Sequence, residues 1–310
     1  MAAPDPSALI VHQYDVSPFS EKVRIVLGVK GLAWRACNQP NMMPKDDLLA
    51  LTGGYRRIPV LQIGADLYFD SLHIIEVLER RHPTPPVFTA SQPASTIGLG
   101  SLSEEAFFRT AVALLFAHDW DATPAFMADR SALMGAPFDA DAMAALRPAQ
   151  EAKMHGNLAT LDGQLADGRA YLTGPQPDVV DAAFYCHLHM VRAGKGRTAA
   201  LLDEHPHLLA WEQRVKGLGQ GRRSEISRTD AIAIARAAVP QPLADTSSPG
   251  PDDPQVGQRV RVKYRDANSP VLEGTLAGIR AHSFSVRRES DAAGTLMLHM
   301  PRCTGTLSAA

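Results

Sequence analysis

The chain opens with a short apolar run and then a longer helical period. Residues 8–14, ALIVHQY, predict a buried strand, and residues 21–29 place their apolar side chains on one face of an amphipathic helix. The polar segment Ser17-Pro18-Phe19-Ser20 lies between the two. A strand followed at once by a helix is therefore expected at the start of the chain.

A second strand and helix pattern follows. Residues 59–69 contain two apolar runs on either side of a Gly-Ala-Asp turn, which predicts a β-hairpin. Apolar positions within residues 72–78 recur at helical spacing, and Ser71 is the expected N-cap of that helix. Together these elements predict one α/β domain over residues 1–86.

Residues 95–239 carry Ala- and Leu-rich helical periods after a Pro-rich connection. Within them, Asp178 can cap a helix whose third residue, Asp181, returns the hydrogen bond. The pattern predicts an all-α second domain, a helical bundle, over residues 95–239.

The chain beyond residue 239 has a different pattern. Residues 240–254 form a linker rich in Pro, Ser and Asp, and residues 255–310, here called the β-module, alternate apolar and polar positions. The expected strands are 260–264, 272–279, 283–286 and 295–300. They predict a small all-β barrel or meander. Because so short a segment buries little apolar area alone, we expect the β-module to dock on the helical domain.

Two polar features near the hairpin predict a peptide-binding site. An X-Pro bond takes the cis form at a cost of only about 0.5–1 kcal/mol, so Ile58-Pro59 can hold a strand edge that offers backbone groups to an extended ligand. At the following helix, Asp70 would attract an ammonium, and the N–H groups after Ser71 would attract a carboxylate. An edge-strand proline and an ordinary helix cap are the plainer alternatives.

Three segments occur in a fixed order with regular spacing: SPFSEKVR at 17–24, RRIPVL at 56–61 and DS at 70–71. Together they resemble the thioredoxin-like domain of cytosolic glutathione transferases. The resemblance implies an α+β multidomain protein whose first domain binds glutathione and whose helical domain holds an electrophilic small molecule. The β-module has no counterpart in ordinary members of that family.

The resemblance implies that Ser17 activates the thiol of glutathione. A free thiol has a pKa of about 8.5, and a hydroxyl hydrogen bond together with the positive end of the following helix lowers it. A simple helix cap is the alternative for Ser17 and for Ser20, and Ser20 fits that role better. Tyr14 is a second candidate hydroxyl, although its place in the strand pattern favours core packing.

The same resemblance implies the contacts of the peptide. Ile58, before a cis Pro59, would pair its backbone with the cysteinyl part, while Asp70 and Ser71 would bind the γ-glutamyl ammonium and carboxylate. The family usually has Glu or Gln where this chain has Asp70. For the glycyl carboxylate, Arg57 and Lys45 are the candidates.

For the second substrate, Phe108 and Trp120 are the expected contacts near the start of the helical domain, although aromatic residues at such spacing also serve as core. The resemblance further implies a homodimer and either conjugation of an electrophile or reduction of a peroxide. A non-catalytic binding or assembly protein of the same fold is the alternative function, favoured by Asp70 and by the β-module.

Composition excludes several other classes. The net charge of −2 over 310 residues gives no argument for binding nucleic acid or a membrane surface. Cys37, Cys186 and Cys303 are far apart and lack metal-ligand spacing, which indicates free thiols. No apolar run approaches the length of a bilayer crossing, and no signal segment is recognisable. We therefore expect a cytoplasmic protein without a metal.

Overall fold

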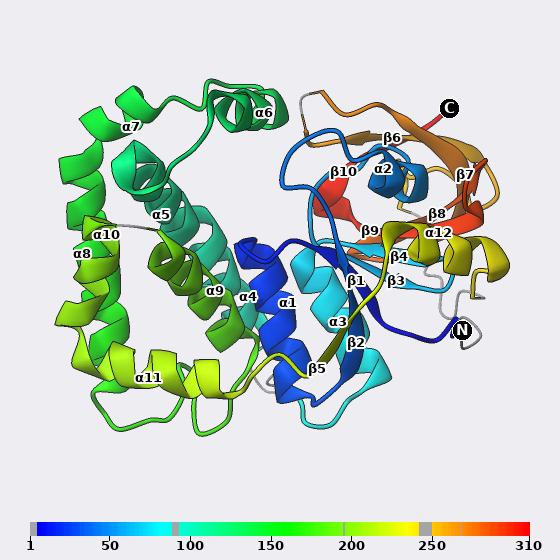
Figure 1. The fold of residues 1–310 in the computed structure, drawn as a ribbon. Helices are drawn as coiled ribbons and strands as arrows, with labels where there is room; N and C mark the ends of the chain where they lie inside the picture. Colours follow the sequence, from blue (N-terminus) through cyan, green and yellow to red (C-terminus); the bar gives the residue numbers. More distant parts are fainter. Residues whose placement is uncertain (1–4, 89–92, 195, 242–249, 267) are drawn as a thin grey trace.

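The computed structural model describes residues 5–88, 93–194, 196–241, 250–266 and 268–310 (Figure 1). Residues 242–249 of the expected linker lie outside these described residues. Figure 1 shows a bundle of helices on one side, a central sheet with α1 and α3 on the face toward that bundle, and the β-module on the other side.

The N-terminal part has the predicted order of elements. Strand β1 pairs parallel with β2 and antiparallel with β3, and β3 pairs antiparallel with β4, which confirms the hairpin. Its elements are β1 (Ile10–Gln13), α1 (Pro18–Val29), β2 (Ala33–Asn38), α2 (Asp46–Thr52), β3 (Val60–Ile63), β4 (Asp66–Phe69) and α3 (Ser71–Arg81).

The caps of the two helices differ from expectation. Ser17 caps α1, because its Oγ accepts a hydrogen bond from the Ser20 N–H at 3.2 Å, while Ser20 lies inside the helix. Asp70, not Ser71, caps α3, and its Oδ1 accepts from the Leu72 N–H at 2.9 Å. Asp70 has a φ of 73°, a conformation that Asp tolerates better than most residues. The predictions of Ser71 and Ser20 as caps were therefore wrong.

The helical domain follows the predicted pattern as far as residue 217. Asp178 and Asp181 form the predicted capping box at the start of α9. Two π-helical turns, η1 and η2, flank α5. The elements are α4 (Pro93–Leu102), η1 (Ser103–Phe107), α5 (Phe108–Leu114), η2 (Leu115–Asp119), α6 (Pro124–Met134), α7 (Ala140–Ala145), α8 (Arg147–Leu165), α9 (Val179–Ala193), α10 (Arg197–Ala200), η3 (Leu201–Glu204) and α11 (Pro206–Gly217).

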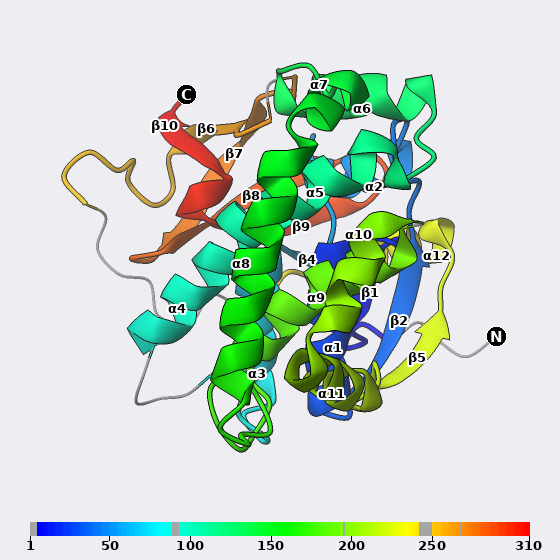
Figure 2. The same cartoon turned by 90° about the vertical axis from the view of Figure 1, so that its left-hand side faces the viewer.

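The chain then leaves the bundle, which corrects the prediction of an all-α segment over 95–239. Strand β5 (Arg222–Glu225) pairs parallel with β2. Helix α12 (Arg228–Ala237) packs Ile234 and Ala231 against Ile10 of β1. Figure 2 shows β5 and α12 on the side of the molecule opposite β10. The return is favoured because β2 would otherwise leave a row of unpaired backbone groups.

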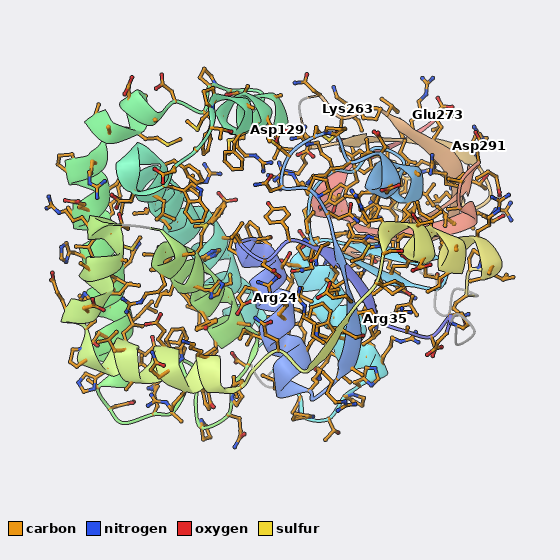
Figure 3. The ribbon with its side chains drawn as sticks, in the orientation of Figure 1. Arg24, Arg35, Asp129, Lys263, Glu273 and Asp291 are labelled. Atoms are coloured by element: carbon orange, nitrogen blue, oxygen red, sulfur yellow. The ribbon has the colours of Figure 1, made fainter. Side chains whose placement is uncertain are left out.

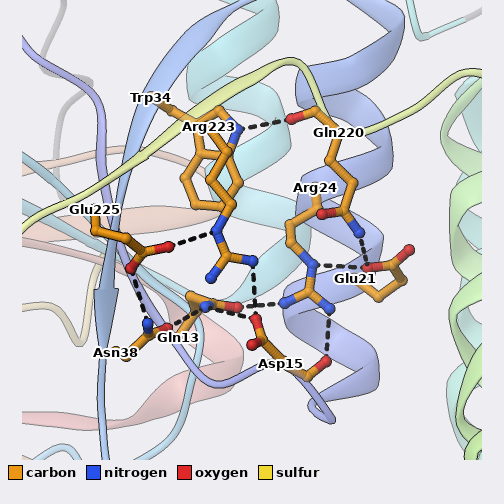
Figure 4. Close-up of polar contacts among 9 residues, drawn as sticks. All are labelled: Gln13, Asp15, Glu21, Arg24, Trp34, Asn38, Gln220, Arg223 and Glu225. Atoms are coloured by element: carbon orange, nitrogen blue, oxygen red, sulfur yellow. Dashed lines mark hydrogen bonds and ion pairs between the residues drawn. The ribbon is translucent and has the colours of Figure 1, made fainter.

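A polar network fixes this returning segment to the N-terminal domain (Figure 4). Buried Arg24 of α1 pairs with Glu21 at 2.7 Å and also contacts Gln13. Gln220 donates to the same Glu21 carboxylate at 2.8 Å, and Arg223 of β5 pairs with Asp15 at 2.9 Å. Because a buried charge is costly without partners, the network ties residues 220–225 to α1.

The β-module forms a meander, as predicted. Its strands are β6 (Arg259–Tyr264), β7 (Leu272–Ile279), β8 (Ser283–Ser290), β9 (Gly294–Pro301) and β10 (Gly305–Ala309), with a short turn η4 (Arg302–Thr304) before the last. Consecutive strands from β6 to β9 are antiparallel, and β10 returns to pair with β6. Alternating burial along β6 matches the alternating sequence.

The β-module docks on the N-terminal domain, so the prediction that it docks on the helical domain was wrong. Strand β9 pairs parallel with β4, and ten strands of the described residues form one sheet in the order β10-β6-β7-β8-β9-β4-β3-β1-β2-β5. Phe69 of β4 and Leu48 of α2 share a hydrophobic core with Leu298 and Val286 of the module. The β-module packs here because β9 supplies hydrogen-bond partners for the backbone N–H and C=O groups along the open side of β4.

None of the helices in the described ranges combines the length and the apolarity that a bilayer crossing requires.

Truncating a side chain in the shared core tests whether the β-module is an integral part of the fold. Leu298 is fully buried between the module and the N-terminal domain. Leu298→Ala should lower the free energy of unfolding by about 2–5 kcal/mol, because it removes apolar contacts and leaves a cavity. Urea unfolding followed by circular dichroism measures this change.

Val271→Ala, at a position 49% exposed beside β7, is the matched control and should stay within about 0.5 kcal/mol of the wild type. Equal stability of the two variants would contradict an integral module.

Candidate functional site

A cavity of about 840 Å³ is lined by residues of the N-terminal domain, the helical domain and the β-module. All predicted site residues but one line it: Tyr14, Ser17, Lys45, Arg57, Ile58, Pro59, Asp70, Ser71, Phe108 and Trp120. The exception is Ser20, which is buried within α1. Residues far apart in the sequence thus meet at one place.

Two hydroxyl groups lie together at the start of α1. Ser17 is 2% exposed and follows the loop after β1, while Tyr14 is the first residue beyond that strand. Burial raises the pKa of Tyr14, and the charge of Arg130 together with hydrogen bonds to Arg130 and Ser17 opposes this shift. The cap at the Ser20 N–H uses an oxygen lone pair of Ser17, and the Ser17 hydroxyl also interacts with Tyr14, so the two hydroxyls form one polar group at the cavity wall.

The hairpin side of the cavity carries the Pro59 and Asp70 features. The Ile58-Pro59 peptide bond is cis, as the sequence indicated. Ser71 is the first residue of α3, so the positive end of that helix faces the cavity beside the Asp70 carboxylate. A carboxylate and the positive end of a helix therefore lie side by side at the cavity wall.

Lys45 is a buried amine at the cavity wall. It is 3% exposed, its Nζ donates to the Arg56 carbonyl at 3.2 Å, and it lies 5.5 Å from the centre of the Tyr14 ring. Burial lowers the pKa of Lys45 from 10.5 to about 7, and the charges of Arg130 and Arg56 add to the shift. A carboxylate bound beside this amine would favour its charged form.

Asp129 of α6 holds two arginines at this end of the cavity, and sequence reasoning missed all three residues. Its carboxylate pairs with Arg56 at 2.7 Å and with Arg130 at 2.6 Å. Although burial opposes the shift, a hydrogen bond from the Met43 N–H and the two arginines lower the pKa of Asp129. Figure 3 places Asp129 on the side of α6 toward the β-module. Arg56 adjoins the predicted Arg57, whereas α6 carried no local signal.

The helical domain contributes a group of apolar and aromatic side chains to the cavity wall. Phe108 begins α5 and contacts Phe19 edge-on, with ring centres 5.0 Å apart. Trp120 follows η2 and lies 6.0 Å from Phe116, between ring centres. Further apolar residues of the helical domain complete this wall: Val112, Leu115, Phe126, Leu133, Met134, Phe138 and Met190. Such a surface can bind an apolar or aromatic molecule.

The β-module supplies a wall that the sequence did not predict. Arg265, Asp266, Cys303 and Thr304 line the cavity. The Asp266 carboxylate pairs with Arg57 at 2.5 Å, which leaves Lys45 as the less engaged of the two predicted carboxylate ligands. The alternation of apolar and polar residues predicted the strands of the β-module. No sequence pattern near Arg265 or Cys303 indicated that the connections between these strands would line the cavity.

The described residues show no cluster of potential metal ligands, and their cysteines are free thiols. No group of three or more His, Cys, Asp or Glu side chains there is arranged to hold a metal. Cys37 and Cys186 are buried free thiols, and Cys303 is an exposed one.

Comparison with known proteins agrees with this architecture. The family model of the glutathione S-transferase N-terminal domain matches residues 11–86, and that of the glutathione S-transferase C-terminal domain matches residues 144–214. No protein of curated function matches the chain.

Among solved structures, a GST-like protein from Pseudomonas syringae is 32% identical, with a TM-score of 0.81. The match covers 98% of this chain and 100% of that one, so it extends through the β-module. Glutathione S-transferase III in its apo form shares the fold at 22% identity and a TM-score of 0.52, over 77% of this chain and all of that one. A glutathione S-transferase from Rhodospirillum rubrum F11 does so at 23% identity and a TM-score of 0.50, over 67% of this chain and 87% of that one.

The thioredoxin-like domain, the helical domain and the cavity lined by both are the architecture of the family that these comparisons identify. The chain belongs to the glutathione S-transferase superfamily.

The amine of Lys45 gives the stability of the protein a pH dependence. The pKa of Lys45 is about 7 in the folded protein and 10.5 for a solvent-exposed lysine. Between pH 7 and pH 10.5 the unfolded chain therefore binds more protons than the folded protein. The free energy of unfolding should therefore rise with pH across this window. Lys45→Met removes that contribution, and its advantage over the wild type should shrink, on the order of a few kcal/mol, from about pH 6.5 to about pH 9.5.

Urea unfolding at both pH values checks this expectation. Lys153→Met, at an exposed position in α8, is the matched control and should give the same difference from the wild type at both. A pH-independent effect of Lys45→Met would show that the Lys45 amine is not shifted.

Proposed function

We propose that the protein is a glutathione transferase that binds glutathione at the N-terminal side of the cavity, activates its thiol and adds it to an electrophilic molecule. The observation that carries the proposal is the convergence of the predicted polar residues and the predicted aromatic residues on one cavity. Ser17 and Tyr14 line this cavity near the start of α1, next to Phe19, whose ring contacts Phe108 of the helical domain.

The chemistry requires a thiolate at neutral pH. A thiol with a pKa of about 8.5 is mostly protonated there, and each unit of lowering corresponds to about 1.36 kcal/mol. The Ser17 hydroxyl would donate a hydrogen bond to the sulfur, and the positive end of α1 would favour its negative charge. The thiol proton passes to solvent, the sulfur forms a bond to the electrophilic carbon, and the leaving group departs with its electron pair.

The polar groups match the ends of the peptide. Asp70 and the first N–H groups of α3 would hold the γ-glutamyl ammonium and carboxylate, and Ile58 would pair with the cysteinyl backbone. Lys45 would bind the glycyl carboxylate, because Arg57 is paired with Asp266. Phe108 and Trp120 would contact an apolar or aromatic electrophile. Reduction of a peroxide would use the same thiolate.

A non-catalytic binding protein of this fold is the second candidate. Two observations favour it: the shorter carboxylate of Asp70 at a position where the family usually has Glu or Gln, and the β-module added to the cavity wall. Such a protein would bind glutathione without turnover.

Calorimetry and kinetics on substituted proteins separate the two candidates. Ser17→Ala should keep glutathione affinity but lower kcat/KM about 10- to 100-fold with a generic electrophile, because each pKa unit lost costs about tenfold in thiolate. The ultraviolet absorbance of bound thiolate should fall in parallel. Tyr14→Phe is the matched control for the neighbouring hydroxyl and should change this absorbance less.

Asp70→Asn tests the ammonium site without disturbing the helix. Asn keeps a cap acceptor and tolerates the positive φ, but it carries no charge. Glutathione affinity should fall about tenfold or more, as expected for a hydrogen bond to a charged group. No detectable wild-type binding at millimolar glutathione would refute the proposal. Binding without turnover of any electrophile would favour the non-catalytic candidate.

The two-fold homodimer and the cytoplasmic location remain predictions from the family resemblance. Light scattering coupled to size-exclusion chromatography measures the first, and a mass equal to one chain would contradict it.

A further inference from the structure

Two connections of the β-module lie together at the cavity. Arg265 and Asp266 follow β6, and Cys303 and Thr304 belong to η4 between β9 and β10. The Arg265 N–H donates to the Thr304 carbonyl at 3.1 Å, which joins the two connections. We call these four residues the module wall.

The register of the sheet brings the module wall to Asp70. Tyr68 of β4 lies opposite His299 of β9, and their rings stack with centres 4.3 Å apart. His299 Nε2 also lies 2.8 Å from the Asp66 carboxylate. Because the two strands are parallel, their carboxyl ends lie at the same end of the sheet. There β4 is followed by Asp70 and β9 by η4.

At this end of the sheet, Asp266 has an ion-pair partner and Arg265 has none among the described residues. Asp266, 4% exposed, pairs with Arg57 at 2.5 Å. Arg265 is exposed and lines the cavity, and no carboxylate of a described residue pairs with it. Its guanidinium donates to the Cys303 carbonyl at 3.5 Å. A cation is therefore available at the cavity wall.

The Thr304 hydroxyl is another polar group of the module wall. Thr304 is 6% exposed and lines the cavity, and its Oγ1 has no hydrogen-bond partner among the described residues. A buried hydroxyl without a partner is uncommon, and its cost is relieved when a ligand or a bound water approaches it.

The Cys303 thiol also lies within the field of Asp70. Burial raises the pKa of Cys303, and the negative charge of Asp70 adds to the shift. The side chains of Cys303 and Asp70 are therefore close enough to interact electrostatically.

We propose that the module wall completes the glutathione-binding site by enclosing its γ-glutamyl end, with Arg265 attracting the γ-glutamyl carboxylate and Thr304 contacting the same group. The inference rests on the proposed function. A γ-glutamyl group carries an ammonium and a carboxylate, and Asp70 and Arg265 offer one opposite charge for each. The enclosure makes the site selective for γ-glutamyl thiols over thiols that lack this group.

The Cys303 thiol serves as a built-in probe of the module wall, because Cys37 and Cys186 are fully buried. The experiment measures alkylation of Cys303 by iodoacetamide, using mass spectrometry of the full-length protein after digestion. S-methylglutathione is the ligand, since it has no free thiol to react. At about ten times its Kd the alkylation rate should fall about tenfold, because only the unliganded fraction reacts.

Truncated ligands identify which end is enclosed. γ-Glutamyl-S-methylcysteine should protect Cys303 at a concentration that gives the same calorimetric occupancy. S-methylcysteinylglycine should not protect it at equal occupancy, because it lacks the γ-glutamyl group.

Substitutions test the two groups directly. Arg265→Gln should weaken S-methylglutathione binding about tenfold or more, and Thr304→Val about threefold, the ranges for a charged and a neutral hydrogen bond. The matched controls are Arg259→Gln and Thr306→Val, exposed residues of β6 and β10 that do not line the cavity, and both should bind as the wild type does.

The outcomes separate this inference from the proposed function. If S-methylglutathione binds but leaves Cys303 alkylation and the Arg265→Gln affinity unchanged, the module wall is not part of the site while the glutathione site stands. If no γ-glutamyl ligand binds the wild-type protein, both proposals are overturned.

Discussion

The pairing of β9 with β4 is the interaction on which the rest of the arrangement depends. It satisfies the backbone groups along the edge of β4 and extends the N-terminal sheet into the β-module. It also lets apolar residues from both parts share one core. Because the register of the two strands is fixed, the turn after β9 meets the start of α3, so a connection more than two hundred residues away in sequence borders the cavity.

Charge divides the cavity into regions with different chemistry. Asp129 gathers Arg56 and Arg130 at one end beside Lys45, and Asp266 pairs with Arg57 near Asp70. The helical domain also contributes apolar and aromatic side chains to the cavity wall. Under the proposed function, these charged groups would bind the zwitterionic peptide and the apolar side chains would bind the electrophile within the same cavity.

Local sequence patterns predicted the elements but not the surfaces on which they pack. The hairpin, the capping box at Asp178 and the meander all followed from short-range rules, and the RRIP and DS segments located most of the predicted site. Docking of the β-module was mispredicted because the affinity of one strand edge for another depends on residues far apart in sequence. Asp266 and Thr304 were missed for the same reason, since nothing near them in the chain resembles a binding motif.

The two returns of the chain to the N-terminal sheet impose an order on its folding during synthesis. The sheet of the first domain has exposed edges at β2 and β4 until β5 and β9 leave the ribosome. Exposed edges are prone to pairing with other chains, and contacts between distant segments form slowly. The first domain is thus the first part of the chain to be synthesised and among the last to be completed, so the growing polypeptide carries an unfinished sheet through most of translation.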